Sequence, residues 1–465
     1  MKTKQKNQKY RPRYHFSAAS GWINDPNGLI CQQGIYHLYY QYNPAGITHG
    51  PMHWGHALSF DLWHWAEQPI ALYPHGEYEM YSGCAVLGLP CVDALYPDQK
   101  NPLALVYTEH QGRGAARRET QNIACSWDGG ISFVPYTQNP VLDEGRSDFR
   151  DPKLWRDPCT GLWTMLLAVR QEIWFYQSAD GAHWQHTSSF QGGTARYQEA
   201  VLECPDLLCL PGPDGAAEFL LLFSVNTNGR GQDRVVYYHG KFSDGRFTCT
   251  DETEHLFDFG PDHYATTSYF SLANRTLCLG WMNNWLYAEQ VPQSGFRGSM
   301  SFPRELCLSM AQSDTLQLRQ VPARELWRHM SPFSTMAPEA ASAFLPPWAF
   351  AGRLALADGV TTICFANTRD ALTITVDTIQ GRVSLDRTRC EVQPGGAEYA
   401  ACTSPPAEAD RHNLLVLADT TSIEVFYADG ALVGTMQFFI ETPFTQVTFS
   451  KAPARAVWYQ PEDVK

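Results

Sequence analysis

The stretch SADGAHW (178–184) decides the interpretation of the fold, because altered copies of it recur along the chain. The copies are SFDLWHW (59–65), SWDGGISF (126–133) and, more weakly, FSDGRF (242–247), with their aspartates 67, 52 and 64 residues apart. An Asp-Gly turn followed by an aromatic strand is typical of a hairpin. Repeats of about this size that hold several strands are typical of propeller blades. The alternative is coincidental turn chemistry, since Ser, Asp and Gly are common in turns.

Short apolar runs bounded by Gly, Pro, Asn and Asp surround the repeats and predict strands. Four examples are GIYHLYYQ (34–41), LWTMLLAV (162–169), EFLLLFSV (218–225) and TLCLGWM (276–282). Long stretches with helical periodicity are scarce, whereas 35 glycines and 30 prolines favour frequent turns. The sequence therefore predicts an all-β protein.

A change of composition after Glu305 predicts a domain boundary. Residues 311–347 first suggest a strand or short helix and then become rich in Pro, Ala and Ser, and alternating strands resume from about Trp348. A chain of 465 residues is expected to form two or three domains. We predict a catalytic β-propeller over residues 1–311, a connecting segment over 312–345 and a β-sandwich over 346–465.

The net charge of −13 argues against binding to nucleic acid or to an anionic membrane surface. The first sixteen residues are basic and polar with no apolar region behind them, and no run of about 18 apolar residues occurs, so neither a secretory signal nor a membrane-spanning helix is expected. The 13 scattered cysteines include no C-x-x-C pair and predict reduced thiols in a cytoplasmic protein. His53 and His56 have H-x-x-H spacing, but no zinc-protease context surrounds them, and no metal site is expected.

Three carboxylates in the first domain share an unusual setting. Asp25, Asp151 and Glu203 each have a proline one or two positions later. Proline cannot donate a hydrogen bond to a β-ladder, so it is found at sheet edges and strand beginnings. In a propeller the innermost strand of each blade is an edge that faces the central channel. Three such strands can therefore aim three carboxylates at one point.

Paired carboxylates are the equipment of a retaining glycosidase, which needs a nucleophile and a general acid/base about 5–5.5 Å apart. Burial and a neighbouring negative charge raise the pKa of a carboxyl group and let it act as an acid. Arg150 is expected to keep the adjacent Asp151 charged, which favours Glu203 as the acid. The structural alternatives are plain turns and an Arg-Asp ion pair, and Asp148 is a competing carboxylate.

Several longer motifs resemble glycoside hydrolase family 32, which contains invertases, exo-fructosidases and sucrose-6-phosphate hydrolases. The resemblance covers nearly the whole chain and implies a five-bladed β-propeller followed by a β-sandwich. The motifs are WINDPNG (22–28), QYNP (41–44), HWGH (53–56), YSG (81–83), FRDPK (149–153), ECP (203–205), GWMNNW (280–285), SLDRT (384–388) and SIEVFYADG (422–430).

The resemblance implies that Asp25 is the nucleophile, Asp151 a transition-state stabiliser and Glu203 the general acid/base. It also implies that the fructosyl unit is contacted by Asn24, Gln41, Trp54, Ser82 and Arg150. Aromatic residues in polar company are further candidates for a sugar pocket; they are Trp22, Trp54, Tyr81, Trp281 and Trp285. No metal or organic cofactor is needed. The departures from the family pattern, which remove no catalytic group, are Ile23, Tyr81 and Cys84.

The expected reaction is release of fructose from the non-reducing β-fructofuranosyl ends of sucrose or short fructo-oligosaccharides. The segment FRGSMSFPREL (296–306) looks more like exo-fructosidases and invertases than phosphosugar hydrolases. Hydrolysis of sucrose 6-phosphate, fructosyl transfer at the same site, an arabinofuranosidase of similar fold and a non-catalytic sugar-binding protein remain as alternatives. A homo-oligomer formed through the sandwich is left open.

Overall fold

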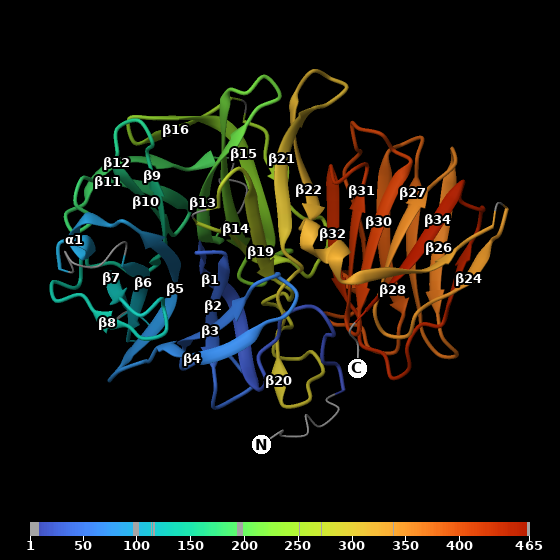
Figure 1. The fold of residues 1–465 in the computed structure, drawn as a ribbon, viewed down its shortest axis with the longest axis horizontal. Helices are drawn as coiled ribbons and strands as arrows, with labels where there is room; N and C mark the ends of the chain where they lie inside the picture. The colour runs from blue at the N-terminus through green and yellow to red at the C-terminus, as the bar shows by residue number, and fades with distance from the viewer. Residues whose placement is uncertain are drawn as a thin grey trace. The chain divides into compact units, whose positions relative to one another are not determined.

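The computed structural model describes residues 9–95, 102–112, 114, 117–192, 199–250, 252–270, 272–337 and 339–462. Strands make up nearly every element, as predicted (Figure 1). The chain divides into two compact units. The propeller unit comprises Gly21–Leu256 and Tyr264–Trp281, and the sandwich unit comprises Met1–Ser20, Phe257–His263 and Met282–Lys465.

The propeller unit holds the strands of four antiparallel sheets, and in each of them its strands pair in chain order. The first sheet holds β1 (Gly21–Gln32), β2 (Ile35–Asn43), β3 (His53–Ser59) and β4 (Ala66–Leu72). The second holds β5 (Tyr78–Leu87), β6 (Leu103–Gln111), β7 (Arg118–Ser126) and β8 (Val134–Pro135), and the short helix α1 (Pro90–Asp93) follows β5. The third holds β9 (Phe149–Arg156), β10 (Trp163–Val169), β11 (Glu172–Ser178) and β12 (Gln185–Phe190). The fourth holds β13 (Val201–Pro211), β14 (Ala217–Asn226), β15 (Arg234–Ser243) and β16 (Arg246–Cys249), and β17 (His255–Leu256) also pairs with β15.

The first strands of the sheets form a closed ring. β1 contacts β5, β5 contacts β9, β9 contacts β13, and β18 (Tyr264–Ser268), which pairs with β19 (Thr276–Trp281), contacts both β13 and β1. Apolar clusters fill the space between successive sheets, for example Trp163 and Val106 between the third and second. This arrangement is that of a β-propeller. The count of five blades stays a prediction, because within this unit β18 is accompanied only by β19 among the described strands.

The recurring stretch, Ser-x-Asp in three copies and Ser-Asp in the fourth, forms the turn between the third and fourth strand of each sheet. Ser59, Ser126, Ser178 and Ser243 end β3, β7, β11 and β15. In the first three copies the serine hydroxyl donates a hydrogen bond to the aspartate two residues on, at 3.2, 2.8 and 3.0 Å. The aspartate in turn accepts backbone N–H groups of the turn. The internal repeat predicted from the sequence is therefore confirmed.

Every strand of the ring also carries a β-bulge, in which one extra residue breaks the register with its neighbour. Bulges bend a strand and re-aim its side chains, and they accommodate proline because local ladder hydrogen bonds are lost. The prolines that drew attention to the three carboxylates lie in or beside these bulges. The residues that fall out of register are Asn24 and Asp25, Ser82, Asp151 and Pro152, Cys204 and Pro205, and Ala265 and Thr266.

Two six-stranded antiparallel sheets form the sandwich. One has the order β23 (Met330–Thr335), β34 (Arg455–Pro461), β25 (Phe350–Ala355), β30 (Asn413–Asp419), β31 (Ser422–Tyr427) and β32 (Leu432–Gln437). The other has the order β24 (Ser342–Phe344), β33 (Gln446–Phe449), β26 (Val360–Ala366), β27 (Ala371–Asp377), β28 (Arg382–Arg389) and β29 (Ala401–Thr403). Phe350, Phe365 and Trp458 pack together in the core, with ring centroids 5.6–6.0 Å apart.

The sandwich unit also contains β20 (Phe296–Arg297), the hairpin of β21 (Arg304–Met310) and β22 (Leu316–Pro322), and two short 3₁₀ turns at Arg324–Arg328 and Ala397–Tyr399. β22, β23 and β24 lie in the segment predicted to connect the domains, and β23 and β24 are edge strands of the sandwich sheets. The domain boundaries at 311 and 346 stay predictions.

A buried network of charges joins the beginning of the chain to the sandwich. The ring of His15 lies 2.9 Å from Asp419 and 2.8 Å from Glu424, and all three side chains are fully buried. Arg304 donates to Glu424 and to Asp258, at 2.9 Å in both cases. Each buried carboxylate of this network is therefore met by a cation or a histidine.

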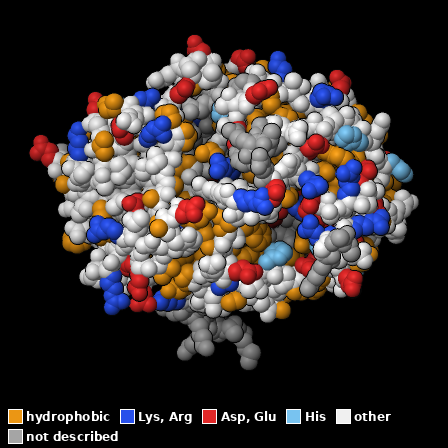
Figure 2. All heavy atoms as spheres, turned by 180° about the vertical axis from the view of Figure 1, so that it is seen from behind, with side chains coloured by type: hydrophobic (Ala, Val, Ile, Leu, Met, Phe, Trp, Pro, Cys, Tyr) orange, Lys and Arg blue, Asp and Glu red, His pale blue; other side chains and the backbone are white. Residues whose placement is uncertain are grey.

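Acidic and basic side chains are interspersed on the face shown in Figure 2, and the expectation that the protein binds neither nucleic acid nor membrane stays a prediction. Among the described residues, no helix has the length and apolar character needed to span a bilayer.

Candidate active site

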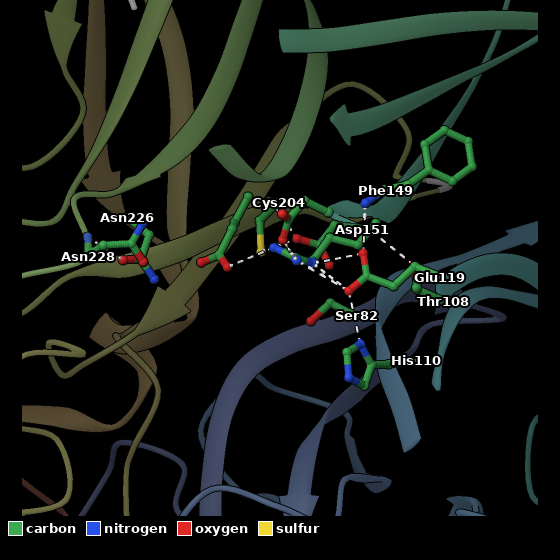
Figure 3. Close-up of polar contacts among 12 residues, drawn as sticks. Ser82, Thr108, His110, Glu119, Phe149, Asp151, Cys204, Asn226 and Asn228 are labelled. Atoms are coloured by element: carbon green, nitrogen blue, oxygen red, sulfur yellow. Dashed lines mark hydrogen bonds and ion pairs between the residues drawn. The ribbon is translucent and has the colours of Figure 1, made fainter. Parts of the chain in front are cut away.

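Asp25, Asp151 and Glu203 lie on three strands of the propeller ring, β1, β9 and β13. Cys204, next to Glu203, brings them together: its thiol lies 3.6 Å from an Asp25 oxygen and 3.7 Å from an Asp151 oxygen (Figure 3). Asp25 and Asp151 are buried, and the side chain of Glu203 keeps 19% of its surface exposed. The structure thus places the three predicted carboxyl groups around one point.

Asp25 accepts hydrogen bonds at both of its oxygens. Asn24 Nδ2 donates to Oδ1 at 3.0 Å and Ser82 Oγ donates to Oδ2 at 2.8 Å. The Asn24 amide is itself oriented by the indole N–H of Trp22, which donates to it at 2.8 Å. Donors at both oxygens suit a group that attacks as a carboxylate.

Asp151 is held by its backbone as well as by its side chain. The residue has a left-handed conformation, with φ of 62°, which is uncommon outside glycine and marks a strained, purposeful position. Its N–H donates to the Thr108 hydroxyl at 3.1 Å, and its carboxyl accepts the N–H of Cys204 at 2.9 Å. Thr108 in turn donates to Gln121 at 2.8 Å.

Arg150 does not act as the sequence suggested. Its guanidinium contacts Glu119, Asp148 and Glu203. Burial and the neighbouring Glu203 raise the pKa of Asp151 to about 8, against a smaller opposing effect of Arg150. The expectation that Arg150 keeps Asp151 charged is therefore wrong. Adjacent residues of a strand point in different directions, so sequence proximity to an arginine does not make an ion pair.

Glu203 is the most accessible carboxyl group of the three. Its Oε2 accepts a hydrogen bond from the hydroxyl of Tyr264 at 2.8 Å, and its Oε1 lies 3.4 Å from Arg150. Burial raises the pKa of Glu203 to about 7 and Asp25 raises it further, while Arg150 and Tyr264 act in the opposite direction. The carboxyl groups titrate as a set, so the set retains a proton near neutral pH.

The predicted aromatic and amide residues occupy the same part of the propeller unit. The Trp54 indole donates to the Tyr81 carbonyl at 2.9 Å, and Trp22 packs against Trp281 with ring centroids 5.8 Å apart. Gln41 donates to the Asn27 amide oxygen at 2.8 Å once that amide is oriented to satisfy its neighbours. Trp285, by contrast, belongs to the sandwich unit and is partly buried there. Its role at the sugar site stays a prediction, as do the other binding roles.

Four residues of the cluster escaped the sequence interpretation. Tyr264 contacts Glu203 from 61 residues away, and Thr108 contacts Asp151 from 43 residues away, separations that carry no spacing signal. Glu119, fully buried beside Arg150, looked like an ordinary strand residue. Asn27 is the exception, because the Asp-Pro-Asn-Gly setting was visible but suggested only a turn. That no metal or cofactor takes part stays a prediction.

A propeller with several buried carboxyl groups on its innermost strands, one of them proton-holding and partly accessible, has what a glycosidase requires. Sequence profiles of known families identify which glycosidases the chain is related to. The sequence profile of the glycosyl hydrolases family 32 N-terminal domain matches residues 15–322, and that of the family 32 C-terminal domain matches residues 354–458. The chain belongs to glycosyl hydrolase family 32.

Individual relatives agree with this assignment. A levanase of Bacillus subtilis is 37% identical over 326 residues, which are 68% of this chain and 47% of the levanase. An extracellular exo-inulinase of Aspergillus niger is 31% identical over 93% of this chain and 90% of its own length. The exo-inulinase structure from Aspergillus awamori superposes with a TM-score of 0.88 at 27% identity, covering 98% of this chain and 99% of the other. A fructofuranosidase of Schwanniomyces occidentalis, solved with fructose, gives 0.86 at 25% identity and 99% of both chains.

Coverage of the relatives is uneven. The chain spans about half the length of the levanase and of the Schizosaccharomyces pombe invertase that it matches, at 47% and 53%. It spans nearly all of the exo-inulinase and fructofuranosidase structures.

Proposed function

We propose that this chain is a retaining β-fructofuranosidase that releases fructose from the non-reducing ends of sucrose or short fructo-oligosaccharides. In this proposal Asp25 is the nucleophile, Glu203 the general acid/base and Asp151 the residue that accepts hydrogen bonds from sugar hydroxyls. The observation that carries it is the position of the Cys204 thiol, 3.6 and 3.7 Å from Asp25 and Asp151 and one residue from Glu203. The names of the relatives and the fructose bound to the neighbouring structure support the substrate class.

In the first step Asp25 attacks the anomeric carbon of fructose while Glu203 gives its proton to the leaving oxygen. Burial raises the pKa of Glu203 to about 7 and that of Asp151 to about 8, so the set of carboxyl groups holds a proton at neutral pH, and Glu203 is its most accessible member. The bond between the anomeric carbon and the leaving oxygen breaks as the bond to Asp25 forms, through an oxocarbenium-like transition state. Asp151 accepts hydrogen bonds from the sugar and stabilises that state.

In the second step Glu203, now a carboxylate, takes a proton from water, and the resulting nucleophile attacks the fructosyl-enzyme. Fructose leaves with its anomeric configuration retained, and Asp25 returns to a carboxylate. Tyr264 donates to Glu203 throughout, at 2.8 Å in the free protein. This donor stabilises the ionised form that the second step needs.

The test is a substrate panel with product analysis. Purified protein is incubated with sucrose, sucrose 6-phosphate and a short inulin oligomer, and the first-formed fructose anomer is followed by NMR. We expect β-fructose first, with sucrose or the oligomer turned over faster than the phosphate. A strong preference for the phosphate contradicts the substrate ranking, dominant transfer to sugar acceptors favours a fructosyltransferase, and binding without cleavage favours a sugar-binding protein.

We also propose that the protein works in the cytoplasm. All 13 cysteines lie in the described part of the chain and are free thiols, and Cys159, Cys209 and Cys307 are exposed. Exposed free thiols persist in a reducing compartment and are oxidised outside it. Activity that fractionates with the medium or the cell surface contradicts this proposal. A homo-oligomer through the sandwich remains an expectation that sedimentation measurements can test.

A further inference from the structure

Glu119 is a buried acidic residue that takes no part in the proposed reaction, yet it binds Arg150, the arginine that contacts Glu203. Glu119, on β7, is fully buried, and both of its oxygens are occupied (Figure 3). Oε1 lies 3.0 Å from His110 Nδ1, and Oε2 accepts the N–H of Phe149 at 2.7 Å. His110 is itself fixed by stacking on Tyr81, with ring centroids 4.4 Å apart and planes 6° apart.

The remaining contacts of Glu119 all go to Arg150. Nε of Arg150 lies 3.3 and 3.2 Å from the two Glu119 oxygens, and Nη2 lies 3.2 Å from Oε1. Nη2 also contacts Asp148. The opposite nitrogen, Nη1, is left to face Glu203 at 3.4 Å. Glu119 therefore binds one edge of the Arg150 guanidinium, and the other edge faces Glu203.

We infer that Glu119, held by His110, is a positioning residue that anchors Arg150 and moderates its charge, so that Glu203 keeps its proton near neutral pH. This inference rests on the proposed function. Glu119 touches no substrate in this scheme and acts only through Arg150 and through its own charge.

The charge of Glu119 favours the protonated form of Glu203 in two ways. An arginine 3.4 Å from the partly buried carboxyl group of Glu203 favours the ionised form of that carboxyl. Burial alone would raise the pKa of Glu119, but His110 and Arg150 lower it to about 2, so Glu119 is ionised at every working pH. Its negative charge offsets that of Arg150 and repels a charge on Glu203. Both effects favour protonated Glu203.

Other charged and titratable groups also surround this arrangement, and none of them changes in the Glu119 variants. They come from β1, β5, β6, β9 and β18 and from the segments before β9 and β15; they are Asp25, Tyr81, His110, Asp148, Asp151, Asp233 and Tyr264. Because only Glu119 changes, a displaced pH profile reports on its charge.

The experiment compares the pH dependence of kcat/KM on sucrose for the wild type, Glu119→Gln and Glu119→Asp. In the wild type the alkaline limb follows loss of the Glu203 proton. For Glu119→Gln we expect that limb to move to lower pH by about one unit. The loss of kcat/KM is then about tenfold at pH 8 but only slight at pH 5, where Glu203 is protonated in both proteins. Glu119→Asp keeps the charge and is expected to keep the limb within about 0.3 unit.

A matched control removes the acidic ion-pair partner of another residue on β7. Asp143→Asn frees Arg118, which neighbours Glu119 on β7, and the pair is partly exposed. We expect no displacement of the limb in this variant. An unmoved limb in Glu119→Gln, with the same fractional loss at every pH, overturns the inference and assigns Glu119 a structural role only.

A second variant keeps the test open if Glu119→Gln does not fold. His110→Phe preserves the stack on Tyr81 but removes the donor to Glu119. The less compensated Glu119 charge should then move the limb to higher pH by a few tenths of a unit, and a limb that moves to lower pH or stays fixed contradicts the inference. If the wild type itself cleaves none of the substrates, the proposed function fails and not this inference, so the two failures are distinguishable.

Discussion

The propeller ring and the sandwich unit bury carboxylates in opposite ways. In the sandwich unit Asp419 and Glu424 are fully buried but meet His15 and Arg304 at 2.8–2.9 Å. Burial alone would raise the pKa of these two carboxyl groups, yet their partners lower it. In the propeller ring burial prevails, and the pKa of Glu203 is raised to about 7.

The difference separates a structural charge cluster from a chemical one. Where cations match carboxylates, the protons are lost and the charges hold the fold together. Where the carboxyl groups of Asp25, Asp151 and Glu203 gather and the guanidinium of Arg150 contacts Glu203 alone of the three and is shared with Glu119, a proton remains and can be transferred. Substitutions in the two regions should therefore have opposite consequences for activity and stability.

The largest effect is expected at the propeller ring. Glu203→Gln removes the general acid/base and should lower kcat by about 10³-fold or more, without lowering the melting temperature, because a buried charge repulsion is relieved. Steady-state kinetics on sucrose and a thermal melt measure both quantities. A variant that retains more than a tenth of wild-type kcat breaks the assignment, and Asp25→Asn provides a second variant with the same expectation.

The next effect is expected in the sandwich unit. Glu424→Gln removes the carboxylate that His15 and Arg304 share, leaves His15 only Asp419 and Arg304 only Asp258 as counter-charges, and should lower the free energy of unfolding by about 3–5 kcal/mol, while kcat per folded molecule stays close to wild type. Urea titration followed by tryptophan fluorescence measures the loss. Glu441→Gln, at an exposed ion pair with Lys9, is the matched control and should change stability by less than about 1 kcal/mol. Equal losses of stability in Glu424→Gln and Glu441→Gln would contradict the view that the buried charge cluster holds the sandwich unit together.

The smallest expected effect is the pH dependence of stability that His15 contributes. Burial lowers the pKa of His15, but Asp419 and Glu424 more than compensate and raise it to about 9, from 6.5 in an unfolded chain. The stability contributed by protonated His15 is fully present below pH 6.5 and is lost as pH rises through 9, amounting to about 3 kcal/mol. Unfolding free energies between pH 6 and 10 should fall more steeply in the wild type than in His15→Gln. Parallel curves for the two proteins contradict this prediction.

The sequence predicted what local chemistry determines. The Ser-x-Asp turns recur because each depends on residues a few positions apart, and their hydrogen bonds span two to four residues. The prolines after Asp25, Asp151 and Glu203 marked interrupted ladders, although the sequence suggested edges where the structure has bulges on edge strands. The class of glycosidase followed from motifs of several residues each.

Contacts between distant strands lay beyond sequence reasoning. Arg150 was assigned to Asp151 because the two are adjacent, whereas the bulge turns Asp151 away and leaves the guanidinium to Glu119, 31 residues earlier. Tyr264 and Thr108 reach the carboxyl cluster only because the ring closes. The division of the chain into units has the same origin, because residues before Ser20 belong with strands near the other end.

Because His15 pairs with Asp419 and Glu424, the buried charge network can form only after most of the chain has been synthesised. The histidine leaves the ribosome 404 residues before its first partner and 409 before its second. At ordinary rates of synthesis it therefore has no partner for about 20–80 s. The propeller ring, whose strands lie between them, can close in the meantime. A chain stopped before Asp419 should present a closed ring with a loose leading segment, and proteases should trim that segment first.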